Sequence, residues 1–158
     1  MFAAIAGVVD HLVWLADQIG DRYEDLLKGF SGRPRSLKTA MHAIEEYGRD
    51  LSRLVLDGQG GLPGLLQMRH VKVYGLKDLN RLEERDPTFA FKMQNMRDQD
   101  VVERLWTKYS ISMRAEDYYS RVPRVYDVST MIRASLVHYN TPEEIAALLK
   151  GLHEIDKS

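Results

Sequence analysis

Hydrophobic residues change their spacing partway along the chain, and this change is the strongest constraint on its fold. Up to residue 57 they recur every three or four positions, which is the spacing of one face of an α-helix. Beyond residue 64 they fall into short runs that are typical of strands. Residues 57–64 (DGQGGLPG) separate the two patterns, because glycine and proline do not extend a helix cheaply. The sequence therefore predicts helices first and a small sheet afterwards.

The helical part contains two long segments. Residues 2–15 are apolar on more than one face, and a helix of this kind must be buried against something large. Residues 37–57 carry a single apolar stripe, which predicts an amphipathic helix, and Ser36 is a suitable N-cap for it. Residues 21–36 are polar and predict a short helix followed by a loop. We therefore expect a buried first helix and an amphipathic second one.

The part after residue 64 predicts both strands and helices. Strands are expected at residues 71–74, 88–92, about 111–113 and 131–137. Helices are expected from Thr141 onward and at residues 98–109, where the inward side chains would be Val101, Val102, Leu105 and Trp106. This order describes an α+β fold, an α/β layer in which a small three- to four-stranded sheet is covered by helices. We expect one domain over residues 1–158, with a helical segment at 1–58 and the sheet-and-helix part at 59–158.

The start of the last helix is marked by consecutive residues. Thr141 is an N-cap and Pro142 occupies the first helical position. Glu143 and Glu144 place negative charge at the positive end of the helix dipole. Asn140 and Thr141 are therefore expected to cap this helix rather than to contact a ligand.

The charge balance and the lack of cysteine exclude several classes of protein. The chain has 22 basic residues, 23 acidic residues and no cysteine. It therefore lacks the basic surplus of nucleic-acid-binding proteins, and it cannot form disulfides or thiolate metal sites. The apolar N-terminal run ends at Asp17, short of the ~20 residues that cross a membrane, and it lacks the basic region of a signal peptide. We expect a cytoplasmic protein that binds neither nucleic acid nor membranes.

Four segments of the sequence resemble one enzyme family. Residues 131–145 (MIRASLVHYNTPEEI) are similar to the closing segment of class V aminotransferases, which depend on pyridoxal phosphate (PLP). Residues 2–17, 81–91 and 109–120 resemble further segments of the family, in the family's order. Together they cover almost the whole chain, and they are closest to the cysteine-desulfurase-like branch. The resemblance implies the fold of the C-terminal small domain of fold-type I PLP enzymes.

The resemblance also implies substrate-binding residues. Arg133 stands at the position of the family's arginine that binds the α-carboxylate of an amino-acid substrate. A guanidinium suits this role because it can hold a carboxylate with two parallel hydrogen bonds. Two further candidates do not come from the resemblance: Arg114 as a second cation and Tyr118 as a hydrogen-bond donor for the same substrate. The alternative for Arg133 is a structural ion pair.

Candidate catalytic residues lie where the sequence departs from the family. Glu116 and Asp117 replace the Gly-His pair that usually occupies this place, and Tyr118 or Tyr119 stands where desulfurases have their cysteine. We expect Glu116, Asp117 and Tyr119 to act as acid, base or hydrogen-bond donor. Desulfurase chemistry by this chain alone is excluded. The alternative is that the two acids form a solvated rim.

No cofactor and no metal is expected for this chain. In the family, the lysine and the phosphate-binding residues for PLP lie in a large domain that precedes the region resembled here. None of the lysines has the Ser-x-x-His-Lys type of context of the family's lysine, and Lys72 and Lys92 are expected to be solvated. His42 and Glu45 have a spacing that can ligate a metal on a helix, but no second pair accompanies them.

Two functions of different classes are compatible with these features. The first is a stand-alone, cofactor-independent derivative of the small domain that binds a small carboxylate-bearing metabolite and cyclises or isomerises it. The second is an accessory subunit that completes a split PLP enzyme together with a separate cofactor-bearing chain. The apolar first helix motivates the second function, because its surface should seek such a chain or form a homodimer. An inactive truncated domain is the third alternative.

Overall fold

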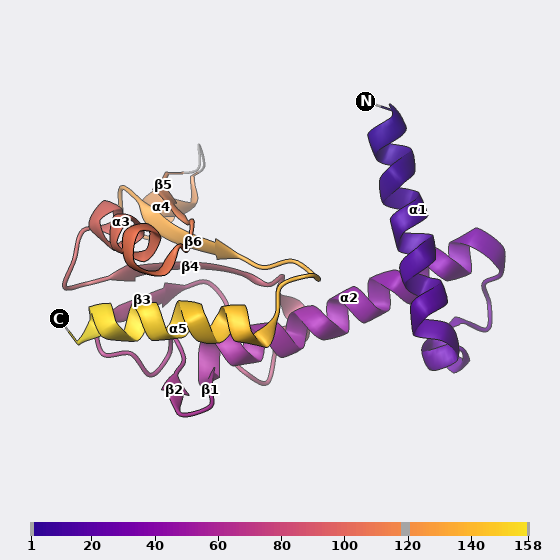
Figure 1. Ribbon diagram of the computed structural model, residues 1–158, viewed down its shortest axis with the longest axis horizontal. Helices are drawn as coiled ribbons and strands as arrows, with labels where there is room; N and C mark the ends of the chain where they lie inside the picture. The colour runs from indigo at the N-terminus through magenta and orange to yellow at the C-terminus, as the bar shows by residue number, and fades with distance from the viewer. Residues whose placement is uncertain (1, 118–120, 158) are drawn as a thin grey trace. The chain divides into compact units, whose positions relative to one another are not determined.

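The chain forms two compact units. The computed structural model describes residues 2–117 and 121–157, and its elements are labelled in Figure 1. The first unit is Met1–Tyr47 and the second is Gly48–Ser158. Helix α2 (Gly32–Asp57) contributes residues to both units. The sheet and all the described candidate site residues belong to the second unit.

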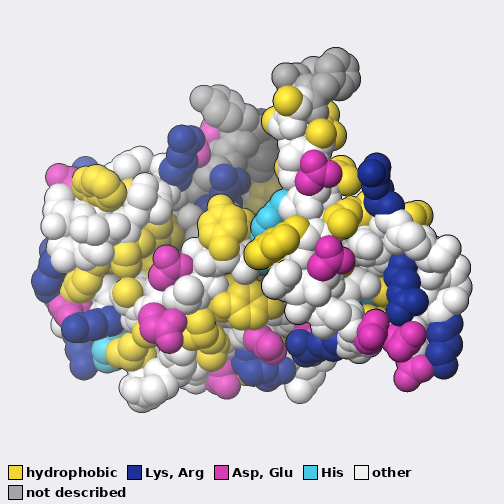
Figure 2. Space-filling model, turned by 45° about the vertical axis from the view of Figure 1, so that its right-hand side comes forward, with side chains coloured by type: hydrophobic (Ala, Val, Ile, Leu, Met, Phe, Trp, Pro, Cys, Tyr) yellow, Lys and Arg dark blue, Asp and Glu magenta, His cyan; other side chains and the backbone are white. Residues whose placement is uncertain are grey.

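Helix α1 (Phe2–Ile19) is largely exposed, so the prediction of a buried first helix was wrong. Ile5, Val8 and Trp14 keep 57%, 60% and 55% of their surface accessible. Figure 2 shows hydrophobic side chains, coloured yellow, at the surface of the molecule. The neighbouring elements η1 (Gly20–Tyr23) and η2 (Asp25–Leu27) are single 3₁₀ turns, too short to offer a large apolar face. Among the described residues, no helix has the length and hydropathy that crossing a bilayer requires.

Helix α2 begins earlier than predicted and ends as predicted. It starts at Gly32, ahead of the expected N-cap Ser36. The Ser36 Oγ donates a 3.5 Å hydrogen bond to the carbonyl oxygen of Gly32, which is the i to i−4 bond of a residue inside a helix rather than a cap. The end of the helix at Asp57 confirms that the glycine-rich segment stops it.

The glycine-rich segment itself forms a hairpin that the sequence pattern did not predict. Strand β1 (Gly58–Gln59) pairs with β2 (Leu62–Pro63) in antiparallel register. Glycine is required at position 58, because φ is +90° and a Cβ atom would lie 2.2 Å from the carbonyl oxygen of Leu62. The Gln59 side chain donates a 2.5 Å hydrogen bond to the carbonyl oxygen of Pro142, which ties the hairpin to the start of the last helix.

The second unit is built on a four-stranded antiparallel sheet. Its spatial order is β3-β4-β6-β5, with β3 at Val71–Tyr74, β4 at Thr88–Met93, β6 at Met131–Ser135 and β5 at Arg114–Glu116. Helices α3 (Asp98–Tyr109) and α5 (Pro142–Asp156) contact each other, and α3 contacts β4, β5 and β6. Shorter elements are η3 (Leu82–Glu84) and α4 (Val122–Val125). The predicted α+β fold is confirmed.

The two faces of this sheet differ in chemistry. Side chains alternate between the faces along a strand, and residues directly opposite on neighbouring strands share a face. One face carries completely buried side chains, which are Phe89, Phe91 and Ile132. The other face carries cations, which include Lys92, Arg114 and Arg133. The apolar face and the buried residues of α3 and α5 form the core.

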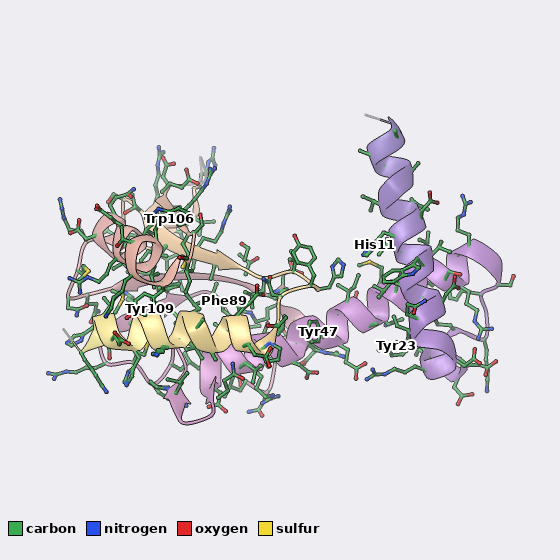
Figure 3. All side chains as sticks on the ribbon, viewed as in Figure 1. His11, Tyr23, Tyr47, Phe89, Trp106 and Tyr109 are labelled. Carbon is green, nitrogen blue, oxygen red and sulfur yellow. The ribbon has the colours of Figure 1, made fainter. Side chains whose placement is uncertain are left out.

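Two details between α3 and β5 differ from prediction. Trp106 is 59% exposed instead of facing inward, whereas Val101 and Leu105 are buried as predicted (Figure 3). The strand expected at 111–113 begins only at Arg114. The cause is the end of α3, where Ser110 has a left-handed φ of 56° and the N–H groups of residues 110 and 111 are hydrogen-bonded to the last turn of the helix.

Candidate functional site

Two arginines stand side by side on the polar face of the sheet. Arg114 of β5 and Arg133 of β6 are directly opposite in register, so their side chains leave the sheet on the same face. Both residues are exposed. Like charges in this arrangement repel each other, and an anion bound between them would relieve the repulsion. The structure therefore places Arg133, which the resemblance assigned to a substrate carboxylate, beside Arg114, the expected second cation.

The acidic candidates lie at the end of β5. Glu116 is half-buried, and its Oε1 atom lies 3.5 Å from Nη1 of Arg114. Its register position opposite Met131 places it on the same face as the two arginines. Asp117 is exposed and directly follows the strand. Tyr118 and Tyr119 lie outside the described residues, so their roles stay predictions.

A cavity of about 440 Å³ lies beside Arg133. Its walls are the end of β6, the residues between α3 and β5, and the first turns of α5. Its volume falls within the range of small-molecule sites, roughly 300–1,000 Å³. The residues that line it are Tyr109, Ser110, Ile111, Ser112, Met113, Arg133, Ala134, Ser135, Leu136, Asn140, Glu144, Ile145, Ala147 and Leu148.

The acid that lines this cavity, Glu144, is engaged in capping α5. Its carboxylate accepts hydrogen bonds of 3.0 Å from the Asn140 side chain and from the N–H of Thr141, while its own N–H donates to Thr141 Oγ1 at 3.3 Å. These contacts confirm the cap that the sequence predicted, and the two reciprocal bonds between Thr141 and Glu144 form a capping box. The bond from Asn140, followed by that from Thr141, lowers the pKa of Glu144. Glu144 therefore stays ionised and engaged at neutral pH, and Arg133 is the cation among the residues that line the cavity.

Lys92 is held by neighbouring groups, so the prediction that it is solvated was wrong. Its Nζ donates to Oδ2 of Asp98 at 2.5 Å and to the carbonyl oxygen of Thr130 at 3.1 Å. The Thr130 hydroxyl donates to the same Asp98 oxygen at 2.6 Å. Asp98 is buried in the first turn of α3, where the helix dipole favours a negative charge. Burial, followed by the negative charge of Asp98, raises the pKa of the nearby Tyr74 hydroxyl.

Three lysines of the second unit, Lys72, Lys92 and Lys108, do not fit PLP. A Schiff base requires a lysine amine that can lose its proton and attack a carbonyl carbon. Lys92 is bound to the carboxylate of Asp98. Lys108 is bound to Glu154 at 2.6 Å, and this hydrogen bond raises the pKa of its amine. The Nζ atom of Lys72 is engaged over the ring of Tyr74, 5.2 Å from its centroid. None of these three is placed to hold the cofactor.

The described residues also show no metal site. They contain no group of three or more histidine, aspartate or glutamate side chains that could surround an ion. The Nδ1 atom of His42 lies 3.8 Å from Oε2 of Glu45, an ion pair across one helical turn when the histidine is protonated. This pair on α2 is therefore explained without a metal.

A comparison with family models shows which family the chain resembles. The model described as Aminotransferase class-V matches residues 37–148. This range includes β3, β4, β5 and β6, and with them Arg114, Glu116 and Arg133. No curated protein matches the chain at a significant level.

Among solved structures the chain is similar to cysteine desulfurases. The apo structure of the enzyme from Thermococcus onnurineus has a TM-score of 0.62 and 20% identity over 79% of this chain and 30% of that chain. The enzyme from Escherichia coli has a TM-score of 0.56 and 22% identity over 76% of this chain and 29% of that chain. The chain thus spans about 30% of the length of these enzymes, and at such identities the likeness concerns the fold alone.

Proposed function

The chain belongs to the class V aminotransferase family, and from this premise we propose that it binds a small carboxylate-bearing metabolite through Arg133 and Arg114. The observation that carries the proposal is that Arg114 of β5 and Arg133 of β6 are register partners, and that Arg133 lines a cavity of about 440 Å³. A carboxylate between them would form charge-assisted hydrogen bonds with both. Each such bond contributes about 1.5–3 kcal/mol.

Glu116 is the group proposed to move a proton on the bound ligand. It is ion-paired with Arg114 at 3.5 Å, so a carboxylate held by Arg114 brings the neighbouring ligand atoms close to it. In an isomerisation, Glu116 would accept a proton from one ligand atom and return it to another. A cyclisation requires the same two transfers, from the attacking group and to the leaving or receiving group. Neither reaction needs an oxidant, a reductant or PLP.

Titration calorimetry with pyruvate and hexanoate tests the binding proposal. Arg133→Met and Arg114→Met keep an apolar stem and remove the charge. We expect each variant to weaken binding of both acids about tenfold, because one charge-assisted hydrogen bond is lost. Lys150→Met, which removes an exposed cation of α5 that does not line the cavity, is the matched control. Wild-type affinity in Arg133→Met would show that the proposal is wrong.

The variant Glu116→Gln separates binding from proton transfer. It removes the carboxylate that competes for Arg114, so a carboxylate ligand should bind about threefold more tightly, in line with the strength of an exposed ion pair. Exchange of the methyl protons of pyruvate, which are next to its ketone, with D₂O should be lost at the same time, as followed by NMR. Exchange at the wild-type rate in Glu116→Gln contradicts the role of Glu116.

A second candidate function, an accessory subunit of a split PLP enzyme, is favoured by helix α1. Apolar side chains that are more than half exposed, as Ile5, Val8 and Trp14 are, commonly mark a protein interface. The partner would be a separate chain that carries PLP. Affinity purification from the source cells, with absorption spectra recorded before and after borohydride, tests this function. A co-purifying chain with a reducible cofactor band supports it, and a pure 18.2 kDa monomer without such a chain contradicts it.

A further inference from the structure

The pairing between β5 and β6 stops short of the end of β6. Arg114 and Arg133 are the last pair, and among the residues described no strand lies opposite Ser135 on the β5 side. The hydrogen bonds that end α3 cause this gap, because they hold residues 110–111 at the helix end. The edge of β6 is therefore open over its last residues.

The backbone of Ser135 points into this open edge. In an antiparallel sheet the N–H and C=O groups of one residue point to the same neighbouring strand, and successive residues alternate. The N–H of Leu136 donates to the carbonyl oxygen of Pro87 at 2.9 Å, on the side of β4. The N–H and C=O of Ser135 therefore point the other way, toward the place that a longer β5 would occupy. An extended segment placed there can donate to Ser135 and accept from it.

The cavity beside Arg133 coincides with this open edge. Ser112 and Met113 line one side of it, and Ser135 lines the other. The buried side chains Ile145 and Leu148 of α5 give it an apolar wall. Arg133, which carries a positive charge, lies two residues before Ser135 in β6, roughly 7 Å along the strand. One end of the cavity is thus suited to an anion, its middle to a peptide group and one wall to an apolar group.

We propose that the ligand is an N-acylated α-amino acid that binds as a short extension of β5. This inference rests on the proposed function, because Arg133 supplies the carboxylate site. The ligand runs antiparallel to β6, as β5 does. Its carboxylate end is therefore the end nearer to Arg133. Its amide N–H donates to the C=O of Ser135, one carboxylate oxygen accepts the N–H of Ser135, and the other oxygen binds Arg133. The acyl group then lies against Ile145 and Leu148, because groups alternate between the two sides of an extended chain.

The same chemistry occurs in two kinds of molecule. One is a small acyl amino acid, for which hexanoylglycine is a suitable probe. The other is the C-terminus of a polypeptide with an apolar penultimate residue, for which a decapeptide ending in Leu-Gly is a suitable probe. Both present a carboxylate, a secondary amide and an apolar group in the required order.

Calorimetric titration of the full chain with matched ligands tests the inference. Hexanoylglycine should bind about tenfold more tightly than hexanoyl-N-methylglycine, which lacks the amide donor, and about tenfold more tightly than hexanoate. Ser135→Pro removes the backbone N–H at an edge position where proline is tolerated. It should weaken the binding of hexanoylglycine about tenfold relative to Ser135→Ala, which keeps that N–H. The methylated ligand needs no variant, so a folding defect of Ser135→Pro does not affect that comparison.

The outcomes separate this inference from the proposed function. Equal affinities for hexanoylglycine and its N-methyl analogue overturn the inference. If the binding of hexanoate still depends on Arg133 in that case, the proposed function is retained. Binding of every acid that does not depend on Arg133 overturns both. Tight binding of the decapeptide alone supports the inference and identifies a polypeptide C-terminus as the source. Similar binding of both probes supports it and shows that a small acyl amino acid suffices.

Discussion

Two cations on the polar face of the sheet, Lys92 and Arg133, differ in how far they are buried. Lys92 and Arg133 leave the same face, yet Lys92 is held by Asp98 and Thr130, whereas Arg133 is exposed and lines a cavity. In the sequence both are cations within strands. Arg133 could be selected because its surrounding segment resembles a family motif. The contact of Lys92 with Thr130 could not be predicted, because Thr130 is 38 residues away and only the fold brings it near.

Removing the Lys92 amine should reveal the cost of a buried carboxylate without its partner. In Lys92→Met, Asp98 keeps the hydroxyl of Thr130 but loses the ammonium at 2.5 Å. The Lys92 side chain is 27% exposed, so water offsets part of the loss, and we expect a destabilisation of about 2 kcal/mol. Urea unfolding followed by circular dichroism measures it. Lys72→Met, at the position opposite on β3, is the control and should change stability by less than about 0.5 kcal/mol. Equal effects of the two changes would contradict this account.

At the scale of elements, local signals predicted most of the second unit. The bounds of α3, the start of α5 and strands β3 and β4 follow from periodicity, capping residues and nearby glycine or proline. The start of β5 could not be predicted this way, because it depends on how the last turn of α3 is closed by residues 110–111. The burial of α1 was predicted wrongly for a similar reason. An apolar pattern shows that a helix needs a partner surface and does not show that the chain provides one.

The cap of α5 should contribute to stability in a pH-dependent way. The pKa of Glu144 is lowered in the folded protein by the hydrogen bonds from Asn140 and Thr141. Its stabilising contribution is therefore complete above its ordinary value of 4.5 and is lost as the pH falls through the lower folded value. Urea unfolding of the wild type and Glu144→Gln should differ at pH 7 and converge toward pH 3. Thr141→Ala, which removes the other half of the box, should cost about 1 kcal/mol.

Glu143→Gln is the control for this pH dependence, because Glu143 lies in the same helical turn and does not belong to the capping box. Its unfolding should stay closer to that of the wild type than the unfolding of Glu144→Gln does at pH 7. A difference between the wild type and Glu144→Gln that grows toward pH 3 would contradict the assigned role of Glu144.

At the scale of the whole molecule, the chain combines a sheet unit with a complete core and a helical unit whose first helix is mostly exposed. The sheet unit contains nearly all of the fully buried large side chains, such as Phe89, Phe91 and Ile132. In the first unit, the described residues of α1 include one buried side chain, Ala16. The apolar surface of α1 can therefore be covered by a partner, and a second copy of the chain is the partner that is present in any pure sample.

Self-association through α1 should depend on its exposed apolar side chains. In analytical ultracentrifugation the wild type should show an average mass above 18.2 kDa that rises with concentration. Ile5→Lys with Val8→Lys removes two side chains that are 57% and 60% exposed and should keep the protein at 18.2 kDa, because charges are expensive to bury in an interface. Ala3→Lys with Ala6→Lys adds the same charge at exposed positions of the same helix and removes little apolar surface, so it should associate more than the first variant does. A wild type that stays at 18.2 kDa at every concentration contradicts self-association. If both double variants dissociate equally, the added charge alone causes the dissociation and the apolar side chains of Ile5 and Val8 do not hold the copies together.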